Sequence, residues 1–169
     1  MNKSSIIQPK FTYLKTPLNK YTFKSQKIRQ WVESNVEGKV LNLFAGIVKL
    51  DCDEIRNDIR KEMNAHYHQD ALRMVSEWKG DNFNTILLDP PYSYRKSMEM
   101  YEGKIMSPFN ALKDKIVKIL EKNGIVITFG YHSTVMGKVR NFEIEHICLM
   151  SHGRAIHDTI ATIERKSNE

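Results

Sequence analysis

The sequence has no apolar run that approaches the ~20 residues needed to span a bilayer. Its N-terminus, from Met1 to Lys10, shows neither the apolar centre nor the cleavage pattern of a signal peptide. Cysteine is scarce, and Cys52 and Cys148 are far apart, without CxxC or metal-ligand spacing. These absences argue against a membrane protein or a disulfide-stapled secreted protein. They predict a cytoplasmic protein with two reduced thiols.

Internal repeats, low-complexity tracts and internal linkers are also missing, so the 169 residues predict one domain with a core of its own. The six histidines follow no metal-ligand spacing. His66 and His68 would point the same way on a strand, but no third ligand is evident, and we expect no metal site.

Positive charge is in excess. The chain has 26 lysines and arginines against 20 acidic residues, a net charge of +6 and a pI of about 9.2. This balance favours polyanionic partners, because neutralising phosphates releases condensed counterions. Many basic proteins bind no nucleic acid, so charge alone does not identify the partner.

Residues 1–22 hold Pro9 and Pro17 among polar and basic residues, and they predict an extended basic arm ahead of a folded domain, residues 23–169. Helical spacing of apolar residues predicts two helices, over residues 23–36 and 109–122. Short apolar runs predict buried strands over residues 40–44, 84–88 and 125–129. Residues 54–59, which are half charged, and residues 65–68 are weaker strand candidates. A closing antiparallel hairpin is predicted from residues 143–150 and 156–164.

Strands that alternate with helices indicate a doubly wound, mostly parallel α/β sheet with a C-terminal antiparallel hairpin. The links between the first three strands are too short for full crossover helices. We therefore expect loops where the first two crossover helices would normally lie.

The sequence Asp89-Pro90-Pro91-Tyr92 directly follows a predicted buried strand. Ligands bind at this edge of an open α/β sheet, and the two prolines fix the backbone between the carboxylate and the ring. Asp89 and the Pro90 carbonyl can accept both N–H bonds of an exocyclic amino group, a poor nucleophile because its lone pair is delocalised. Tyr92 can stack on the base. This pattern predicts a catalytic site.

A second turn of interest follows the strand that contains Val40 and Leu41. There the small residues of Phe44-Ala45-Gly46 would let backbone amides approach a bound cofactor closely.

The order of these motifs resembles that of the class I S-adenosyl-L-methionine-dependent amino-methyltransferases, and most of all the adenine-N6-specific DNA methyltransferases. Their catalytic tetrapeptide is Asp-Pro-Pro-Tyr or a near variant. The resemblance covers residues 39–165. It implies a Rossmann-like methyltransferase sheet, S-adenosyl-L-methionine as cofactor and DNA as the partner.

By the same resemblance, Phe44, Ala45 and Gly46 match the loop that packs on the methionine part of the donor. Asp58 matches the residue that holds the ribose hydroxyls, and Asp70 the one that reads the adenine amino group. The match departs after Gly46, where Ile47-Val48 replace another small residue and a glycine.

Two further segments are candidates for substrate contacts. The residues Tyr94, Arg95 and Lys96 follow the catalytic motif, and His152 and Arg154 lie in the exit loop of a strand expected to run parallel to the others. Neither the segment from Tyr92 to Pro108 nor that from Asp70 to Phe83 can hold a large target-recognition insert. Recognition must therefore come from a partner subunit, local contacts or substrate shape, and a homodimer or a separate recognition partner is an open expectation.

Three alternatives remain. The first is an RNA methyltransferase that acts on guanine N2 of ribosomal RNA or on adenine N6, since ribosomal guanine-N2 methyltransferases also pair Phe-Ala-Gly with Asp-Pro-Pro-Tyr and also lack the insert. Cytosine-N4 DNA methyltransferases more often have serine at the position of Asp89, which disfavours that group. The third is a non-catalytic nucleic-acid-binding subunit of a two-chain methyltransferase, against which the intact Asp89 argues.

Overall fold

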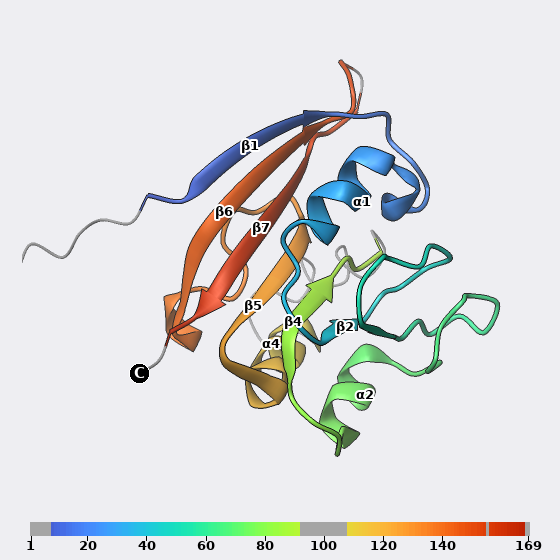
Figure 1. The fold of residues 1–169 in the computed structure, drawn as a ribbon, viewed down its shortest axis with the longest axis vertical. Helices are drawn as coiled ribbons and strands as arrows, with labels where there is room; N and C mark the ends of the chain where they lie inside the picture. Colours follow the sequence, from blue (N-terminus) through green and yellow to red (C-terminus); the bar gives the residue numbers. More distant parts are fainter. Residues whose placement is uncertain (1–7, 92–107, 155, 168–169) are drawn as a thin grey trace, which may run out of the picture.

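The computed structural model describes residues 8–91, 108–154 and 156–167, and in them seven strands form one sheet (Figure 1). The order across the sheet is β1-β6-β7-β5-β4-β2-β3. The strands are β1 (Lys10–Lys15), β2 (Val40–Asn42), β3 (Glu54–Arg56), β4 (Phe83–Leu88), β5 (Leu120–Gly130), β6 (Phe142–Ser151) and β7 (Thr159–Lys166). Among these strands, only the pairings of β7 with β5 and β6 are antiparallel. The predicted mostly parallel sheet and its closing hairpin are confirmed.

Helices cover the two faces of the sheet unequally. They are α1 (Gln26–Glu33), preceded by the 3-10 turn η1 (Thr22–Lys24), then α2 (Ala71–Glu77) and α4 (Pro108–Ile119), with a further 3-10 turn η2 at Lys138–Arg140. α1 packs on one face and α2 and α4 on the other. No helix in the described part of the chain is long and apolar enough to cross a membrane.

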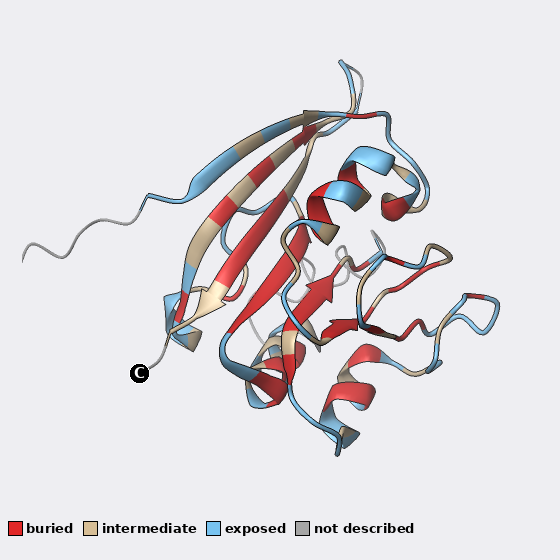
Figure 2. Ribbon diagram, in the orientation of Figure 1, coloured by how far each residue is buried: buried red, intermediate tan, exposed pale blue. Residues whose placement is uncertain are grey.

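Alternation along the central strands builds two cores. On β4, Ile86 and Leu88 pack with α2 and α4, whereas Leu87 packs on the α1 side. Period-2 alternation sends successive side chains to opposite faces, so a strand covered on both sides is apolar throughout. In Figure 2, β4 is mostly buried and β5 is buried along most of its length, whereas β1 is largely exposed.

The loops expected in place of the first two crossover helices are confirmed, since residues 43–53 and 57–66 contain no helix. The strand candidate at residues 65–68 is wrong as a strand: Tyr67 makes only an isolated parallel bridge with Asn57. Helix α2 was not predicted. Its signal is Asp70, whose carboxylate accepts the Arg73 N–H at 3.0 Å as an N-cap, followed by the apolar Ala71 and Met74.

The helix predicted to reach residue 122 ends at Ile119, and β5 begins at Leu120. Lys166 of β7 explains the early end, because its Nζ donates to the carbonyls of Val117 at 2.8 Å and Leu120 at 3.2 Å. A lysine ammonium is a favourable partner for the free carbonyls at a helix C-terminus.

The segment predicted as an arm is extended, but residues 10–15 of it form the edge strand β1, which pairs in parallel with β6. Thr16 then fixes the chain to the rest of the molecule. Its N–H donates to the Ser151 carbonyl at 3.0 Å, and its hydroxyl lies 2.7 Å from that of Ser25, the N-cap of α1. Part of the predicted arm therefore belongs to the sheet.

Candidate functional site

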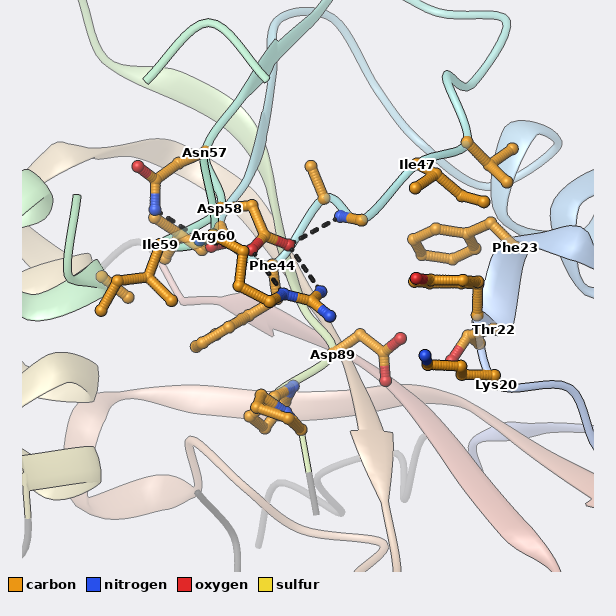
Figure 3. Close-up of a pocket in the computed structure, with 18 of the residues that line it drawn as sticks. Lys20, Thr22, Phe23, Phe44, Ile47, Asn57, Asp58, Ile59, Arg60 and Asp89 are labelled. Atoms are coloured by element: carbon orange, nitrogen blue, oxygen red, sulfur yellow. Dashed lines mark hydrogen bonds and ion pairs between the residues drawn. The ribbon is translucent and has the colours of Figure 1, made fainter. Parts of the chain in front are cut away.

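A cleft of about 700 Å³ opens at the carboxyl ends of the parallel strands (Figure 3). β2, β3 and β4 run in the same direction, so the residues that follow them meet at one edge. The cleft gathers every described residue predicted for the cofactor and for catalysis: Phe44, Ala45, Gly46, Asp58, Asp70, Asp89, Pro90 and Pro91. Residues far apart in the sequence thus share one cavity.

The loop after β2 forms one wall of the cleft. Gly46 has a φ of +58°, a left-handed conformation that favours glycine. A Cβ added there would meet only the Tyr21 ring, at 3.5 Å, so the space above the backbone is otherwise open. The Gly46 N–H donates to Asp58 at 3.0 Å and the Ala45 N–H to the Asn57 carbonyl at 2.9 Å. The loop is therefore tied to the chain that follows β3.

Arg56, at the end of β3, holds this loop from behind. Its side chain is only 2% exposed, and its guanidinium donates to the carbonyls of Val48 at 2.5 Å and of Ala45 and Gly46 at 3.1 Å each. A crossover helix would have satisfied such carbonyls within itself. Here one guanidinium takes the place of a helix as the donor, since a buried carbonyl without a partner is costly.

Glu54 balances the buried charge of Arg56. Its carboxylate accepts from the Arg56 guanidinium at 2.7 Å, from the Leu50 N–H at 2.8 Å and from the Asn42 amide at 3.1 Å. Both side chains are almost wholly buried. Residues 54–59 are half charged, which makes them a weak strand candidate in the sequence, yet Glu54 and Arg56 are the charges that hold the loop.

Asp58 carries two kinds of contact in the cleft (Figure 3). One oxygen accepts the Gly46 N–H, and Arg60 makes a bidentate pair with both oxygens through Nε and Nη2 at 3.1 Å each. Burial raises the pKa of the Asp58 carboxyl, but the hydrogen bonds from Arg60 and Gly46 outweigh it and hold that pKa below its usual value. The carboxylate is therefore ionised, with its acceptor positions largely used.

Asp70 and Ile59 line the same part of the cleft. Asp70 uses one oxygen to cap α2, and a carboxylate has further acceptor positions. Ile59 is 64% exposed. Together they present an apolar surface next to hydrogen-bond acceptors.

Asp89 lies directly after β4, half-buried, between the buried Leu88 and the buried Pro90. Tyr92, the last residue of the predicted catalytic motif, and Tyr94, Arg95 and Lys96 lie outside the described residues.

Two cleft residues that the sequence did not suggest come from the last strands: Tyr131 follows β5 and Thr159 begins β7. The Tyr131 ring stands 6.2 Å from that of His157, edge to face.

The structure does not bring His152 and Arg154 into the lining of the cleft. His152 joins three strand ends instead, since its Nδ1 lies 2.9 Å from the Thr16 carbonyl and its Nε2 2.8 Å from the Thr159 hydroxyl. A carbonyl only accepts, so Nδ1 donates and Nε2 accepts from the hydroxyl. Arg154 is exposed.

The opposite wall of the cleft comes from the N-terminal segment. Leu18 and residues 20–23 line it, and Figure 3 shows Lys20 and Thr22 facing the side of Asp89. The segment reaches this position because Thr16 turns the chain from β1 toward α1.

No protein-family model and no curated protein matches the chain. Solved structures do resemble it. The N-methyltransferase NodS from Bradyrhizobium japonicum WM9 has a TM-score of 0.60 at 13% identity, over 89% of this chain and 100% of that one. Its complex with S-adenosyl-L-homocysteine has a TM-score of 0.57 at 13% identity, over 88% of this chain and 90% of that one.

TrmN from Thermus thermophilus has a TM-score of 0.59 at 11% identity, over 83% of this chain and 47% of that one. A proposed rRNA methylase from Clostridium thermocellum has a TM-score of 0.51 at 11% identity, over 88% of this chain and 99% of that one. At such identities the likeness is one of fold. The chain has the Rossmann-like fold of class I methyltransferases.

Proposed function

We propose that this chain is an S-adenosyl-L-methionine-dependent methyltransferase acting on the exocyclic amino group of a nucleic-acid base, adenine N6 in DNA. One observation carries the proposal. The Phe-Ala-Gly turn, the two acidic residues and the Asp-Pro-Pro segment follow separate strands or bridges, yet they line a single cleft. Parallel strands bring these residues to one edge, and their types are those that a methyltransferase cleft needs.

The cleft fits a donor of this kind. Its volume of about 700 Å³ is that of a site for a molecule of nucleotide size. The open backbone at Gly46 suits the methionine part, the Asp58 carboxylate the ribose hydroxyls, and Ile59 and Asp70 the two sides of an adenine ring. When bound, the donor supplies an electrophilic methyl group. Asp58 can receive hydroxyls only if Arg60 gives up some of its bonds to the carboxylate.

Asp89 and Pro90 would orient the acceptor amine. The carboxylate and the Pro90 carbonyl accept its two N–H bonds, which draws the nitrogen toward a tetrahedral geometry and turns its lone pair toward the donor. Positive charge develops on this nitrogen during transfer, so the hydrogen bond to Asp89 strengthens in the transition state. Asp89 and the buried Pro90 directly follow the end of β4, so the strand and the proline rings restrict both acceptors.

A nucleic acid as the substrate is supported by the net charge of +6 and by the catalytic motif. The short segments on either side of that motif leave no room for a large recognition insert. We therefore propose that the isolated chain binds with little sequence preference and that selection comes from substrate shape or from a partner. An RNA base as substrate is the second candidate, favoured by the missing insert and by the likeness in fold to the proposed rRNA methylase.

The test is a methyl-transfer assay with isotope-labelled donor on DNA and on RNA, followed by nucleoside mass spectrometry. We expect N6-methyladenine in DNA. N2-methylguanine or N6-methyladenine in RNA alone would replace the DNA assignment and retain the reaction. Donor binding without transfer to either polymer would contradict methylation of a nucleic-acid base.

The variant Asp89→Ala should lower the single-turnover rate by about a hundredfold or more, the effect of losing one preorganised partner worth ~3 kcal/mol. Donor affinity and melting temperature should stay close to those of the wild type, because Asp89 faces the acceptor. If Asp89→Ala turns over normally, the catalytic assignment is wrong. A loss of stability with unchanged specific activity would mark a structural turn.

A further inference from the structure

The positive charge of the chain is unevenly distributed. Residues 1–32 hold seven of the 26 lysines and arginines and none of the 20 acidic residues. The rest of the chain holds 19 basic and 20 acidic residues and is therefore almost neutral. The whole excess of charge is carried by residues 1–32, whose described part runs from the outer edge of the sheet through one wall of the cleft to helix α1.

Within the described part of this segment, five lysines are exposed: Lys10, Lys15, Lys20, Lys24 and Lys27. Their backbone is held in place. The Thr16 N–H donates to Ser151, the Thr16 carbonyl accepts from His152, and Lys27 donates to the Lys15 carbonyl at 2.9 Å. These contacts fix the backbone that carries the lysines.

Two exposed aromatic residues lie between Lys10 and Lys15 along the chain. Phe11 is 63% and Tyr13 56% exposed, and because they are two residues apart on β1 they point to the same face of the sheet. Their neighbours in register on β6 are Ile147 and Leu149, which are only half-buried. Lys15 shares this face, whereas Lys10 points to the opposite face with Thr12 and Leu14. This end of the sheet therefore offers an exposed apolar and aromatic surface with a lysine at its end.

The same segment continues to the cleft. Tyr21 lines the cleft, and the Nζ atoms of Lys20 and Lys24 stand 5.5 and 5.6 Å from the centre of its ring. Lys20 itself lines the cleft with Asp89. Cations and rings thus follow one another from β1 to the edge at which the catalytic residues lie, as Figure 1 shows for the path of the chain.

We infer that residues 10–24 form a binding track for single-stranded nucleic acid, which leads the strand flanking the target base into the cleft. This inference rests on the proposed function. Lysines along a fixed backbone neutralise phosphates, and exposed rings stack on unpaired bases, whose faces a duplex would hide. The charge of this segment indicates which partner binds there. Residues 10–24 contain no acidic residue and are complementary to a polyanion. A second copy of this chain would instead bring the same positive charge against them.

The test compares two triple variants by titrating labelled single-stranded DNA and RNA oligonucleotides and the matching duplexes at several salt concentrations. The track variant is Lys10→Gln, Lys15→Gln and Lys24→Gln. The control is Lys79→Gln, Lys115→Gln and Lys118→Gln, three exposed lysines outside the cleft lining that give the same change in net charge. None of the six lines the cleft, so donor affinity should be unchanged in both.

The track variant should lower the slope of log affinity against log salt by about 2 in magnitude, at about 0.7 per phosphate contact on a single strand. This corresponds to a loss on the order of 100-fold at 0.1 M salt and little loss at 1 M. The control should lose far less. The variant Phe11→Thr with Tyr13→Thr keeps strand propensity and should lower affinity by about tenfold per ring at every salt concentration.

Equal losses in the track and control variants would overturn the track while leaving the proposed reaction intact, provided the wild type still methylates nucleic acid. Tighter binding of duplex than of single-stranded oligonucleotides would show that the ligand is double-stranded and would overturn the inference. If light scattering shows that the wild type is a dimer and that Phe11→Thr with Tyr13→Thr is a monomer, this face is a protein interface and the inference is overturned. A wild type that binds donor but neither binds nor methylates nucleic acid would overturn the proposed function as well.

Discussion

Arg56 lets the molecule omit its first crossover helix, so its removal is the most direct test of how the cleft is built. The variant Arg56→Met keeps the approximate length of the side chain and removes all of its hydrogen-bond donors. It leaves the Glu54 carboxylate buried without its cation and the carbonyls of Ala45, Gly46 and Val48 without their donor. Breaking a buried ion pair from one side costs ~3–5 kcal/mol.

That cost is a large part of the ~5–15 kcal/mol that stabilises a typical domain. A chain of this size loses about 2–4 °C in melting temperature per kcal/mol, so Arg56→Met should lower the melting temperature by about 6–20 °C. The affinity for S-adenosyl-L-methionine should fall too, since the loop that contains Gly46 loses its hydrogen bonds to Arg56. The measurements are thermal unfolding with and without S-adenosyl-L-methionine, and calorimetry of donor binding.

Two further variants separate the ion pair from the support of the loop. The double variant Glu54→Gln with Arg56→Met removes both charges but still leaves the loop carbonyls without donors, and it should remain strongly destabilised. Arg73→Met, which breaks a pair whose side chains are 68% and 56% exposed, is the control and should cost less than ~1 kcal/mol. A melting temperature of Arg56→Met close to that of the wild type, with unchanged donor affinity, would refute this account of the loop.

Two other predictions follow from polar contacts. Arg60→Ala should strengthen binding of the methyl donor by up to about fivefold, because a pair whose cation is 45% exposed is worth about 1 kcal/mol or less and its loss frees the buried Asp58 carboxylate for the ribose hydroxyls. Calorimetry that shows weaker binding would mean that Arg60 stays beside the methyl donor. Burial and the nearby Lys10 charge lower the pKa of His146, so the unfolded chain takes up the proton first. Stability should therefore fall as the pH drops below the usual histidine value of ~6.5, and His146→Gln should flatten that slope in denaturant titrations at several pH values.

The parts of the fold that could be predicted are those with strong local patterns. The apolar runs at residues 40–44 and 84–88 and their small-residue or proline ends place β2 and β4, and with them the turn at Gly46 and the segment that begins at Asp89. Because parallel strands share one carboxyl edge, the meeting of Asp58, Asp70 and Asp89 in one cleft also followed from the topology. The roles assigned to these residues stay predictions.

What the sequence did not reveal depends on tertiary partners. Thr12 and Leu14 look like residues of a polar arm until β6 supplies their register, and Pro9 and Pro17 mask the strand between them. Arg56 resembles a surface charge, because local pattern does not show that three carbonyls of a missing helix surround it. Tyr131 enters the cleft only through the order of the last strands.

The pairing of β1 with β6 also bears on the order of assembly. Thr12 and His146 are in contact although 134 positions separate them along the chain. Closing so long a loop is entropically costly, and as the chain is synthesised its first strand has no partner until almost the last one exists. β6 must therefore be synthesised before β1 can pair with it. The contacts that tie the cleft wall of residues 18–23 to the end of β6 through Thr16 therefore depend on a strand made more than 100 residues later.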